Sequence, residues 1–573
     1  MFNFFKKKKK ANERGQEIST QERFRQKYTA FQQLLHENNH ALEIMADIEE
    51  KMTGEYLFDI NYITGRASAI SESMSRLVNH LDNLSHGKYA QLHRSYESIK
   101  DRIDAALQNR IEIPQADDIL PLQQIQADMT LIAGGKMANL GVIRHSLNIR
   151  VPEGFVITSS AFKRFMEHSQ VQEKLSKMLS GLNIKNMVEI EEASRAIQEM
   201  IIEAELPPEL ERHILEATDD LYSRSRQKQG FSVRSSAIFE DGDFSFAGQY
   251  ETLLHVKPDR IIRSYKTVVA SLFSPRAIFY AKNKGFSEGD MVMAVGVMEM
   301  VSARAGGVLY TRDPNDPGRN VMIINGAWGL AKAVVDGKMK TDTFVIERNS
   351  GALLETNIGE KSHMYAAGID GGLHVAEVEE QLHNAPCLTK TEINGLGRYA
   401  LDLETHYGKP QDIEWAVSET GEVFILQTRP LRLMKQETAT KIPRRIDGYA
   451  VLIDKGVIAS RGIGVGPVYF VRSDDDLQGF PEGAVLVSRT TSTRFVTVME
   501  RAAAIITDIG GATGHMASLA REYQVPAILN TDSATRILQQ GQEITVDAFH
   551  CNIYEGRVPE LLDYAAKKKK SFQ

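Results

Sequence analysis

The 573-residue sequence predicts a multidomain protein: an N-terminal all-α bundle, a central α+β domain and a C-terminal β/α domain. Apolar residues recur at helical spacing up to about residue 110, whereas short apolar runs alternate with glycine turns from Pro121 onward. A basic, threonine-rich stretch then suits a hinge. We expect a helical domain at 1–110, a linker at 111–121, the central domain at 122–432, a hinge linker at 433–450, the C-terminal domain at 451–565 and a basic tail at 566–573.

Composition and charge exclude several classes of protein. With 42% hydrophobic and 25% charged residues, the chain can bury more than one core. The net charge of -7 gives no overall attraction to nucleic acid, and no stretch is long and apolar enough to span a membrane. Cys387 and Cys551 make no disulfide framework, and the apolar start precedes its lysines, unlike a signal peptide. We therefore expect a cytoplasmic protein with solvated lysine runs at 6–10 and 567–570.

Three amphipathic helices are predicted in the first domain, with breaks at Gly54 and Gly87. The first helix carries a stripe of apolar residues at helical spacing: Phe24, Tyr28, Phe31, Leu35, Leu42, Met45, Ile48 and Met52. The pattern is typical of a small bundle or helical hairpin, in which such a stripe is core or a homodimer contact.

Two segments of the central domain suit phosphate binding. Two glycines precede Lys136, and they allow backbone and ammonium to approach a phosphate together. Further on, a predicted strand ends at Val233, and Arg234 and Ser235 follow it with a guanidinium fork and a hydroxyl donor. Each signal alone is weak, because lysine-containing loops are common and Arg234 could instead pair with Glu240 at a surface turn.

The central domain closes with two strand-like runs, at 410–416 and 423–430, joined by a turn. A hairpin would bring Glu414 and Gln427 side by side. Two oxygen donors on neighbouring strands can hold Mg²⁺, which keeps its other positions for water and phosphate. A lone Glu and Gln on a hairpin are, however, usually just solvated.

The C-terminal domain contains the segment with the clearest chemistry. The apolar run at 502–506 predicts a buried strand, glycines follow, and His515 falls at or near a helix N-terminus, where anions are favoured. A neutral imidazole there can accept a phosphoryl group, and Arg521 lies about two turns further on. The alternative is a surface or capping histidine after an ordinary glycine turn, which is the commoner explanation of an isolated G-G-x-T-x-H motif.

Taken together, the motifs resemble the phosphoenolpyruvate synthase and pyruvate phosphate dikinase family. The matching runs are GGK…NLG…VPEGFVIT, VRSSA…ED…SFAGQ, DIEWA, LQTRP and GGATGHMASLAREYQVPAIL, in the family's order over roughly 125–560. At Ala331 and Lys332, however, the family usually has glycine and glutamate, and at Gly514 and Met516 it often has cysteine and a small residue.

The resemblance implies an ATP-grasp nucleotide-binding domain followed by a phosphohistidine swivelling domain. It makes His515 the phosphocarrier, with Gly511, Thr513 and Arg521 in the same catalytic segment. It assigns ATP contacts to Lys136, Arg234, Ser235, Arg312, Gln427 and Arg429, and Mg²⁺ ligation to Glu414 and Gln427. The loop around 247–249 would be a flexible cover over the triphosphate.

The expected function is that of an ATP-dependent phosphotransferase of the pyruvate, water dikinase type. The resemblance implies attack by His515 at the β-phosphate of ATP, and then transfer to an unidentified acceptor on a separate subunit or protein. Fewer than sixty residues follow His515, too few for the pyruvate-binding barrel that follows this domain in the family. The alternative from another class is a regulatory nucleotide-binding phosphorelay protein that acts through its N-terminal helices.

Overall fold

The computed structural model describes residues 20–52, 60–85, 87–108, 113–180, 182, 186–225, 228–238, 250–283, 291–337, 339–368, 371–433 and 443–562. The chain divides into two compact units. The first comprises Met1–Glu112, Met178–Glu192 and Ile278–Met291, and the second comprises Ile113–Lys177, Ala193–Ala277 and Val292–Gln573. The predicted cover loop, half of the predicted hinge (434–442) and both lysine runs lie outside the described residues.

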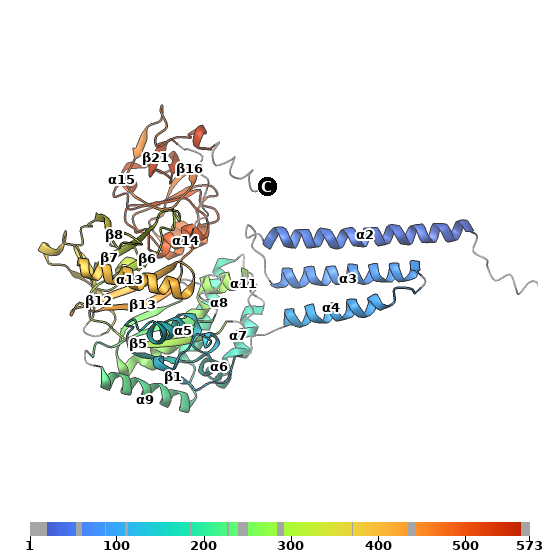
Figure 1. Cartoon of the computed structure of the whole chain (residues 1–573), viewed down its shortest axis with the longest axis horizontal. Coiled ribbons are helices and arrows are strands. Elements are labelled where there is room, and N and C mark those ends of the chain that lie inside the picture. The colour runs from blue at the N-terminus through green and yellow to red at the C-terminus, as the bar shows by residue number, and fades with distance from the viewer. Residues whose placement is uncertain are drawn as a thin grey trace, which may run out of the picture. The chain divides into compact units, whose positions relative to one another are not determined.

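Three long helices form the N-terminal region, as the sequence predicts: α2 (Thr20–Met52), α3 (Ile60–Ser85) and α4 (Gln91–Gln108) (Figure 1). Helix α3 contacts both of the others. None of the helices in the described residues is long and apolar enough to cross a membrane. The break at Gly87 is confirmed, because this residue has a φ of 83° between α3 and α4.

The apolar stripe of α2 is not the core of this bundle. Helix α2 instead buries Ala41 and Ile44, each 3% exposed, and Glu37 pairs with Arg76 of α3 at 2.9 Å. Six members of the predicted stripe are exposed: Phe24, Tyr28, Phe31, Leu35, Leu42 and Met45. The sequence pattern predicted the helix correctly, but the packing uses another of its faces.

The second unit begins with a five-stranded antiparallel sheet in the order β1-β2-β5-β3-β4. Its strands are β1 (Ile119–Pro121), β2 (Gly154–Ile157), β3 (Phe231–Ala237), β4 (Thr252–Val256) and β5 (Met293–Glu299). Between residues 130 and 283 lie the helices α5 (Thr130–Ser146), α6 (Ser159–His168), α7 (Val171–Ser180), α8 (Met187–Glu203), α9 (Pro208–Arg224), α10 (Ile261–Ala270) and α11 (Pro275–Asn283); parts of α7, α8 and α11 belong to the first unit. Strand β5 lies within the continuous apolar run at 291–301, a pattern typical of a buried strand.

A six-stranded antiparallel sheet follows, in the order β13-β12-β6-β7-β8-β9. Its strands are β6 (Ala303–Tyr310), β7 (Val321–Trp328), β8 (Asp342–Glu347), β9 (Leu353–Asn357), β12 (Gln411–Ser418) and β13 (Val423–Pro430). Helix α13 (Lys390–Tyr407) contacts β6, β12 and β13, and a capping box fixes its start. This part also contains α12 (Lys332–Val335) and the hairpin of β10 (His363–Ala367) and β11 (Leu373–Glu377).

The C-terminal part is built on an eight-stranded mixed sheet in the order β14-β21-β20-β16-β17-β18-β19-β15. The strands are β14 (Val451–Ile453), β15 (Val457–Ser460), β16 (Ile463–Phe470), β17 (Val485–Ser488), β18 (Ala504–Thr507), β19 (Ala527–Leu529), β20 (Glu543–Asp547) and β21 (Asn552–Glu555). Successive residues of β18 belong to two different apolar clusters, one containing α14 (His515–Glu522) and the other α15 (Ala534–Ile537). The central strands are therefore covered on both faces, which explains their continuous apolar runs.

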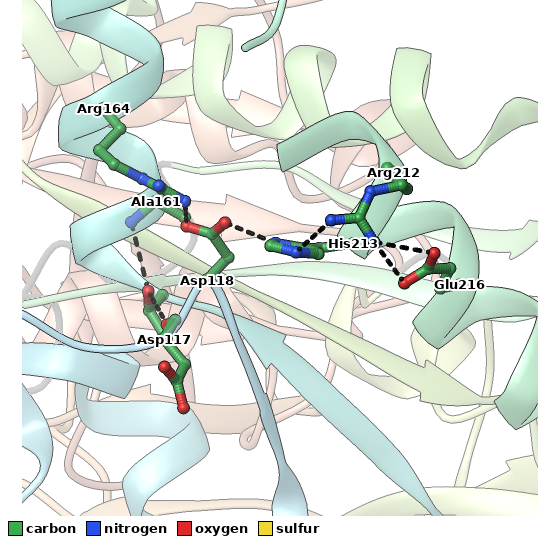
Figure 2. Close-up of polar contacts among 8 residues, drawn as sticks. Asp117, Asp118, Ala161, Arg164, Arg212, His213 and Glu216 are labelled. Atoms are coloured by element: carbon green, nitrogen blue, oxygen red, sulfur yellow. Dashed lines mark hydrogen bonds and ion pairs between the residues drawn. The ribbon is translucent and has the colours of Figure 1, made fainter. Parts of the chain in front are cut away.

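Asp118, one residue before β1, fastens two helices to the edge of the five-stranded sheet (Figure 2). Asp118 is 5% exposed; its carboxylate forms an ion pair with Arg164 of α6 and accepts a hydrogen bond from Nδ1 of His213 of α9 at 2.8 Å. The contacts continue outward along α9, where Arg212 pairs with Glu216 at 3.0 Å.

We expect Asp118→Ala to lower the free energy of unfolding by about 1–3 kcal/mol, because two donors lose their common acceptor. The loss stays below that of a fully buried pair, since the Arg164 and His213 side chains are 45% and 37% exposed and water can hydrate them. Urea-induced unfolding measures the change. The control Glu216→Ala removes an exposed pair and should cost less than about 1 kcal/mol; an equal loss in both variants would contradict the role of Asp118.

Candidate active site

A cavity of about 390 Å³ is lined by both antiparallel sheets and by the start of α14. Six of the residues predicted from the sequence to form the site lie in its walls: Lys136, Arg234, Glu414, Gln427, Arg429 and His515. They come from four separate regions of the chain. The fold therefore gathers three permanent or near-permanent cations, two oxygen donors and a histidine around one space.

Lys136 reaches the cavity from a kinked helix. Helix α5 contacts β3 and β5 of one sheet and β13 of the other, so it lies where the two sheets approach each other. Gly134 breaks the helix, with a φ of 71°, and a Cβ there would lie 1.8 Å from the carbonyl oxygen of Ser236. Only glycine fits this close approach. Lys136 consequently sits in the first turn after the kink, 8% exposed, with Nζ 3.3 Å from the hydroxyl of Ser235.

Arg234 lies within a strand rather than after one. Strand β3 continues to Ala237 and pairs Arg234 with Gly296 of β5, so the predicted strand end at Val233 is wrong. Strand β5 pairs with β3 beyond Val233, and the local sequence gives no sign of this pairing. The Arg234 guanidinium donates to the carbonyl of Leu426 at 2.8 Å and to Oε1 of Gln427.

The hairpin predicted for the end of the central domain is confirmed, because β12 and β13 pair Glu414 directly with Gln427. Their side chains present two oxygen donors to the cavity. Among the described residues no group of three or more His, Cys, Asp or Glu side chains is arranged to hold a metal ion. This donor set nevertheless fits Mg²⁺, which is usually bound by one or two protein oxygens together with water and phosphate. The amide oxygen of Gln427 would then bind Mg²⁺ in addition to accepting the hydrogen bond from Arg234.

Arg429 is held in place by a carboxylate on the neighbouring strand. The β12–β13 register places it opposite Asp412, which is 6% exposed and accepts from Nε at 2.9 Å and from a terminal nitrogen at 2.8 Å. Burial opposes the charge, but Asp412, together with Tyr310 and Glu414, outweighs this effect and raises the pKa of Arg429. The guanidinium therefore stays charged and oriented at the cavity wall.

His515 is the first residue of α14, after the cap Gly514, so its predicted place at a helix N-terminus is confirmed. Burial, followed by the charges of Arg429, Lys136 and Lys332, lowers the pKa of His515 to about 3. All of these effects disfavour the imidazolium. The imidazole is thus neutral at physiological pH and keeps a lone pair for nucleophilic attack.

The other residues of the predicted catalytic segment make structural contacts. Thr513 is buried and accepts a hydrogen bond from Asn325 of β7 at 3.0 Å. Arg521 is 7% exposed and donates to the hydroxyl of Tyr310 at 3.0 Å and to the carbonyl of Ala459 at 3.0 Å. Arg521 lines a smaller cavity of about 50 Å³ together with His515, whereas Gly511 lines neither cavity.

Two of the predicted ATP contacts, Ser235 and Arg312, do not line the cavity, whereas Lys332, which was not predicted as a site residue, does. Arg312 is not in the cavity wall; its Nε lies 3.5 Å from Glu404, which Arg348 also binds. Lys332 does line the cavity, and its Nζ is 3.2 Å from Asp336. In the sequence, Lys332 stood out only because the family that the motifs resemble usually has glutamate at this position.

We expect His515 to remain neutral throughout the range from pH 8 to pH 5. The pKa is lowered from the ordinary 6.5 to about 3, so protonation begins only well below this range. The same shift means that the unfolded chain binds a proton which the folded chain does not, and this contribution destabilises the fold as pH falls from 6.5 towards 3. NMR titration of labelled histidines, with His515→Gln to assign the signal, measures the shift. A midpoint near 6.5 would contradict it.

Comparison with known proteins agrees with this geometry. The family described as "Pyruvate phosphate dikinase, AMP/ATP-binding domain" matches residues 130–448, and the one described as "PEP-utilising enzyme, mobile domain" matches residues 480–550. A probable phosphoenolpyruvate synthase of Methanothermobacter thermautotrophicus is 35% identical over 76% of this chain and 63% of its own length. One from Archaeoglobus fulgidus is 38% identical over 77% and 58%, and the phosphoenolpyruvate synthase of Pseudomonas aeruginosa is 34% identical over 74% and 56%.

The chain thus spans roughly three fifths of the length of these relatives. The matched regions contain all six cavity residues, since Lys136 to Arg429 fall in the first match and His515 in the second. The match to the nucleotide-binding domain also covers more than half of the 573 residues. The chain therefore belongs to the phosphoenolpyruvate synthase and pyruvate phosphate dikinase family.

Proposed function

We propose that this protein is an ATP- and Mg²⁺-dependent phosphotransferase of the pyruvate, water dikinase type, in which His515 carries the phosphoryl group. One observation carries the proposal: a neutral histidine at a helix N-terminus lines the same cavity as Lys136, Arg234 and Arg429. A nucleophile and a cluster of cations around one enclosed space are the components that phosphoryl transfer requires.

The nucleotide would bind between the two antiparallel sheets. The cavity wall at 298–301, at the end of β5, is mainly apolar and suits the base. Lys136, Arg234 and Arg429 then clamp the phosphates; the Nε of Arg234 is buried without a partner among the described residues, which leaves a donor for a phosphate oxygen. Mg²⁺ held by Glu414 and Gln427 would neutralise phosphate charge and align the phosphate chain.

His515 supplies the covalent step. A lone pair of the neutral imidazole attacks the β-phosphorus of ATP, an N–P bond forms, and the bond from the β-phosphorus to the oxygen shared with the α-phosphate breaks. AMP leaves with that oxygen, and the remaining imidazole proton passes to solvent. Water then attacks the γ-phosphorus and releases phosphate, so that a phosphohistidine remains.

His515 would move between the ATP site and a second site, at which the acceptor binds. We propose that 122–432 is an ATP-grasp domain and that 451–565 is a swivelling domain. Hydrogen bonds and ion pairs join the two ranges: Thr513 accepts from Asn325, Arg521 donates to Tyr310, and Lys340 pairs with Asp532 at 3.2 Å. Such contacts can be exchanged for water, whereas a large apolar interface cannot.

The acceptor would lie outside this cavity, on another subunit or protein. The similar proteins compared above carry the name phosphoenolpyruvate synthase, so pyruvate is the first acceptor to test. A regulatory phosphorelay that acts through α2–α4 is the rival from another class, and the family match favours the transferase.

The test is incubation with Mg²⁺ and ATP labelled separately at the β- and γ-phosphates. We expect acid-labile, base-stable β-label on the protein, release of AMP, and loss of the label on addition of the correct acceptor. Retained γ-label would keep the phosphohistidine but overturn the dikinase chemistry. No label from either nucleotide, with ATP binding intact, would overturn the transferase assignment.

A further inference from the structure

Helix α2 has two apolar faces, and only one of them is covered within the described chain. The covered face includes Ala41 and Ile44 and packs on α3. The other face consists of large side chains that are between 43% and 70% exposed: Phe24, Tyr28, Phe31, Leu35, Leu42 and Met45. We call these six residues the α2 stripe. Isolated exposed apolar side chains are ordinary, but a continuous row along one helix is typical of a contact surface.

The α2 stripe has the spacing of a coiled-coil seam. Successive members are separated by four, three and four residues up to Leu35, and by three between Leu42 and Met45. Asn38 occupies the one position of this repeat that is polar, and it is also exposed. From Phe24 to Met45 the seam is about 30 Å long. This repeat lets the side chains of one helix insert between those of a second helix along the whole length.

Charge along α2 indicates which helix fits there. Its exposed N-terminal part carries Arg25 and Lys27, whereas Glu43 and Glu49 are exposed near the C-terminal end. The helix dipole disfavours positive charge at the N-terminal end and negative charge at the C-terminal end, so both groups of charges lie at their unfavourable end. A parallel copy would place like charges together. An antiparallel copy brings the basic end of each helix to the acidic end of the other and also opposes the two dipoles.

We propose that α2 pairs antiparallel with α2 of a second copy of this chain through the α2 stripe. In the register that pairs most of the α2 stripe, Tyr28 lies against Met45 of the second copy, Phe31 against Leu42, and Leu35 against Asn38. Phe24 then lies against Glu49, beyond the end of the stripe. Twofold symmetry repeats each of these contacts. Asn38 is the single polar position of the seam, and such a position fixes register at some cost in stability. This dimer does not depend on phosphotransfer by His515.

Sedimentation velocity of the full-length chain at micromolar concentration tests the pairing. The wild type should sediment as a dimer, and Phe31→Glu combined with Leu35→Glu should sediment as a monomer, with Kd raised at least 100-fold. Thr29→Glu combined with Gln33→Glu is the matched control, because it adds the same charge at exposed positions off the stripe, and it should remain dimeric. Circular dichroism should show equal helix content in all three. A monomeric wild type, or a stripe variant that remains dimeric, overturns the proposal and leaves the stripe to another partner.

Disulfide cross-linking tests the orientation. A chain that carries both Tyr28→Cys and Met45→Cys should form a cross-linked dimer on oxidation, above the background set by Cys387 and Cys551 in the wild type. Tyr28→Cys alone should not exceed that background, because the two copies of residue 28 lie at opposite ends of an antiparallel seam. Cross-linking by Tyr28→Cys alone, or its absence in the double variant, overturns the antiparallel arrangement.

Discussion

His515→Gln is expected to abolish β-label incorporation from ATP, with a fall of at least about 10⁴-fold in the rate of self-phosphorylation. Glutamine preserves a neutral, hydrogen-bonding side chain at the start of α14 but offers no lone pair of comparable nucleophilicity. Because His515 is itself neutral, the charge of the cavity does not change, and ATP affinity should stay within about threefold of the wild type. Filter-bound radioactivity and calorimetric titration with ATP measure the two quantities.

His406→Gln is the control for this substitution, because His406 is exposed on α13, far from any predicted role in the site. We expect this variant protein to be labelled at the wild-type rate. If His515→Gln retained label of the same acid lability, another residue would be the acceptor. If it lost ATP binding as well, His515 would be part of the nucleotide site in the ground state rather than the nucleophile alone.

Arg429→Lys is expected to slow self-phosphorylation by about 10²–10³-fold, the usual effect of removing one preorganised donor to a charged transition state. Lysine keeps the positive charge beside the buried Asp412, so the fold survives, but it cannot present the guanidinium fork that Asp412 holds through two nitrogens. The loss should appear in the rate of labelling at saturating ATP and Mg²⁺. Single-turnover kinetics with β-labelled ATP measure it.

Arg312→Lys is the matched control. The motif in the sequence gave Arg312 a phosphate contact, whereas the structure pairs it with Glu404 outside the cavity wall. We expect its rate of labelling to change by less than about threefold. Equal losses in both variants would contradict the placement of Arg312, and a wild-type rate for Arg429→Lys would contradict the role of Arg429.

The local elements of the site follow from short stretches of sequence. The continuous apolar run at 502–506 predicted β18, because a strand that is covered on both faces needs no polar alternation. The turn between two strand-like runs predicted the β12–β13 hairpin and hence the pairing of Glu414 with Gln427. Hairpin register depends on residues within a few positions of the turn, so it can be read without knowledge of the rest of the chain.

The motifs by themselves therefore determined the family, the position of His515 at the start of a helix and the neighbouring pair Glu414 and Gln427. Tertiary structure decided which other side chains share the cavity, because β3 continues past Arg234 only when paired with β5, and α5 kinks at Gly134 only where Ser236 comes close. It also brought Lys332 to the cavity and excluded Arg312 from its wall. Likewise, periodicity marked one apolar stripe on α2, but only the packing against α3 decided that another face of the helix is buried. In each case the deciding contact joins residues far apart in the chain, and no local pattern encodes such a contact.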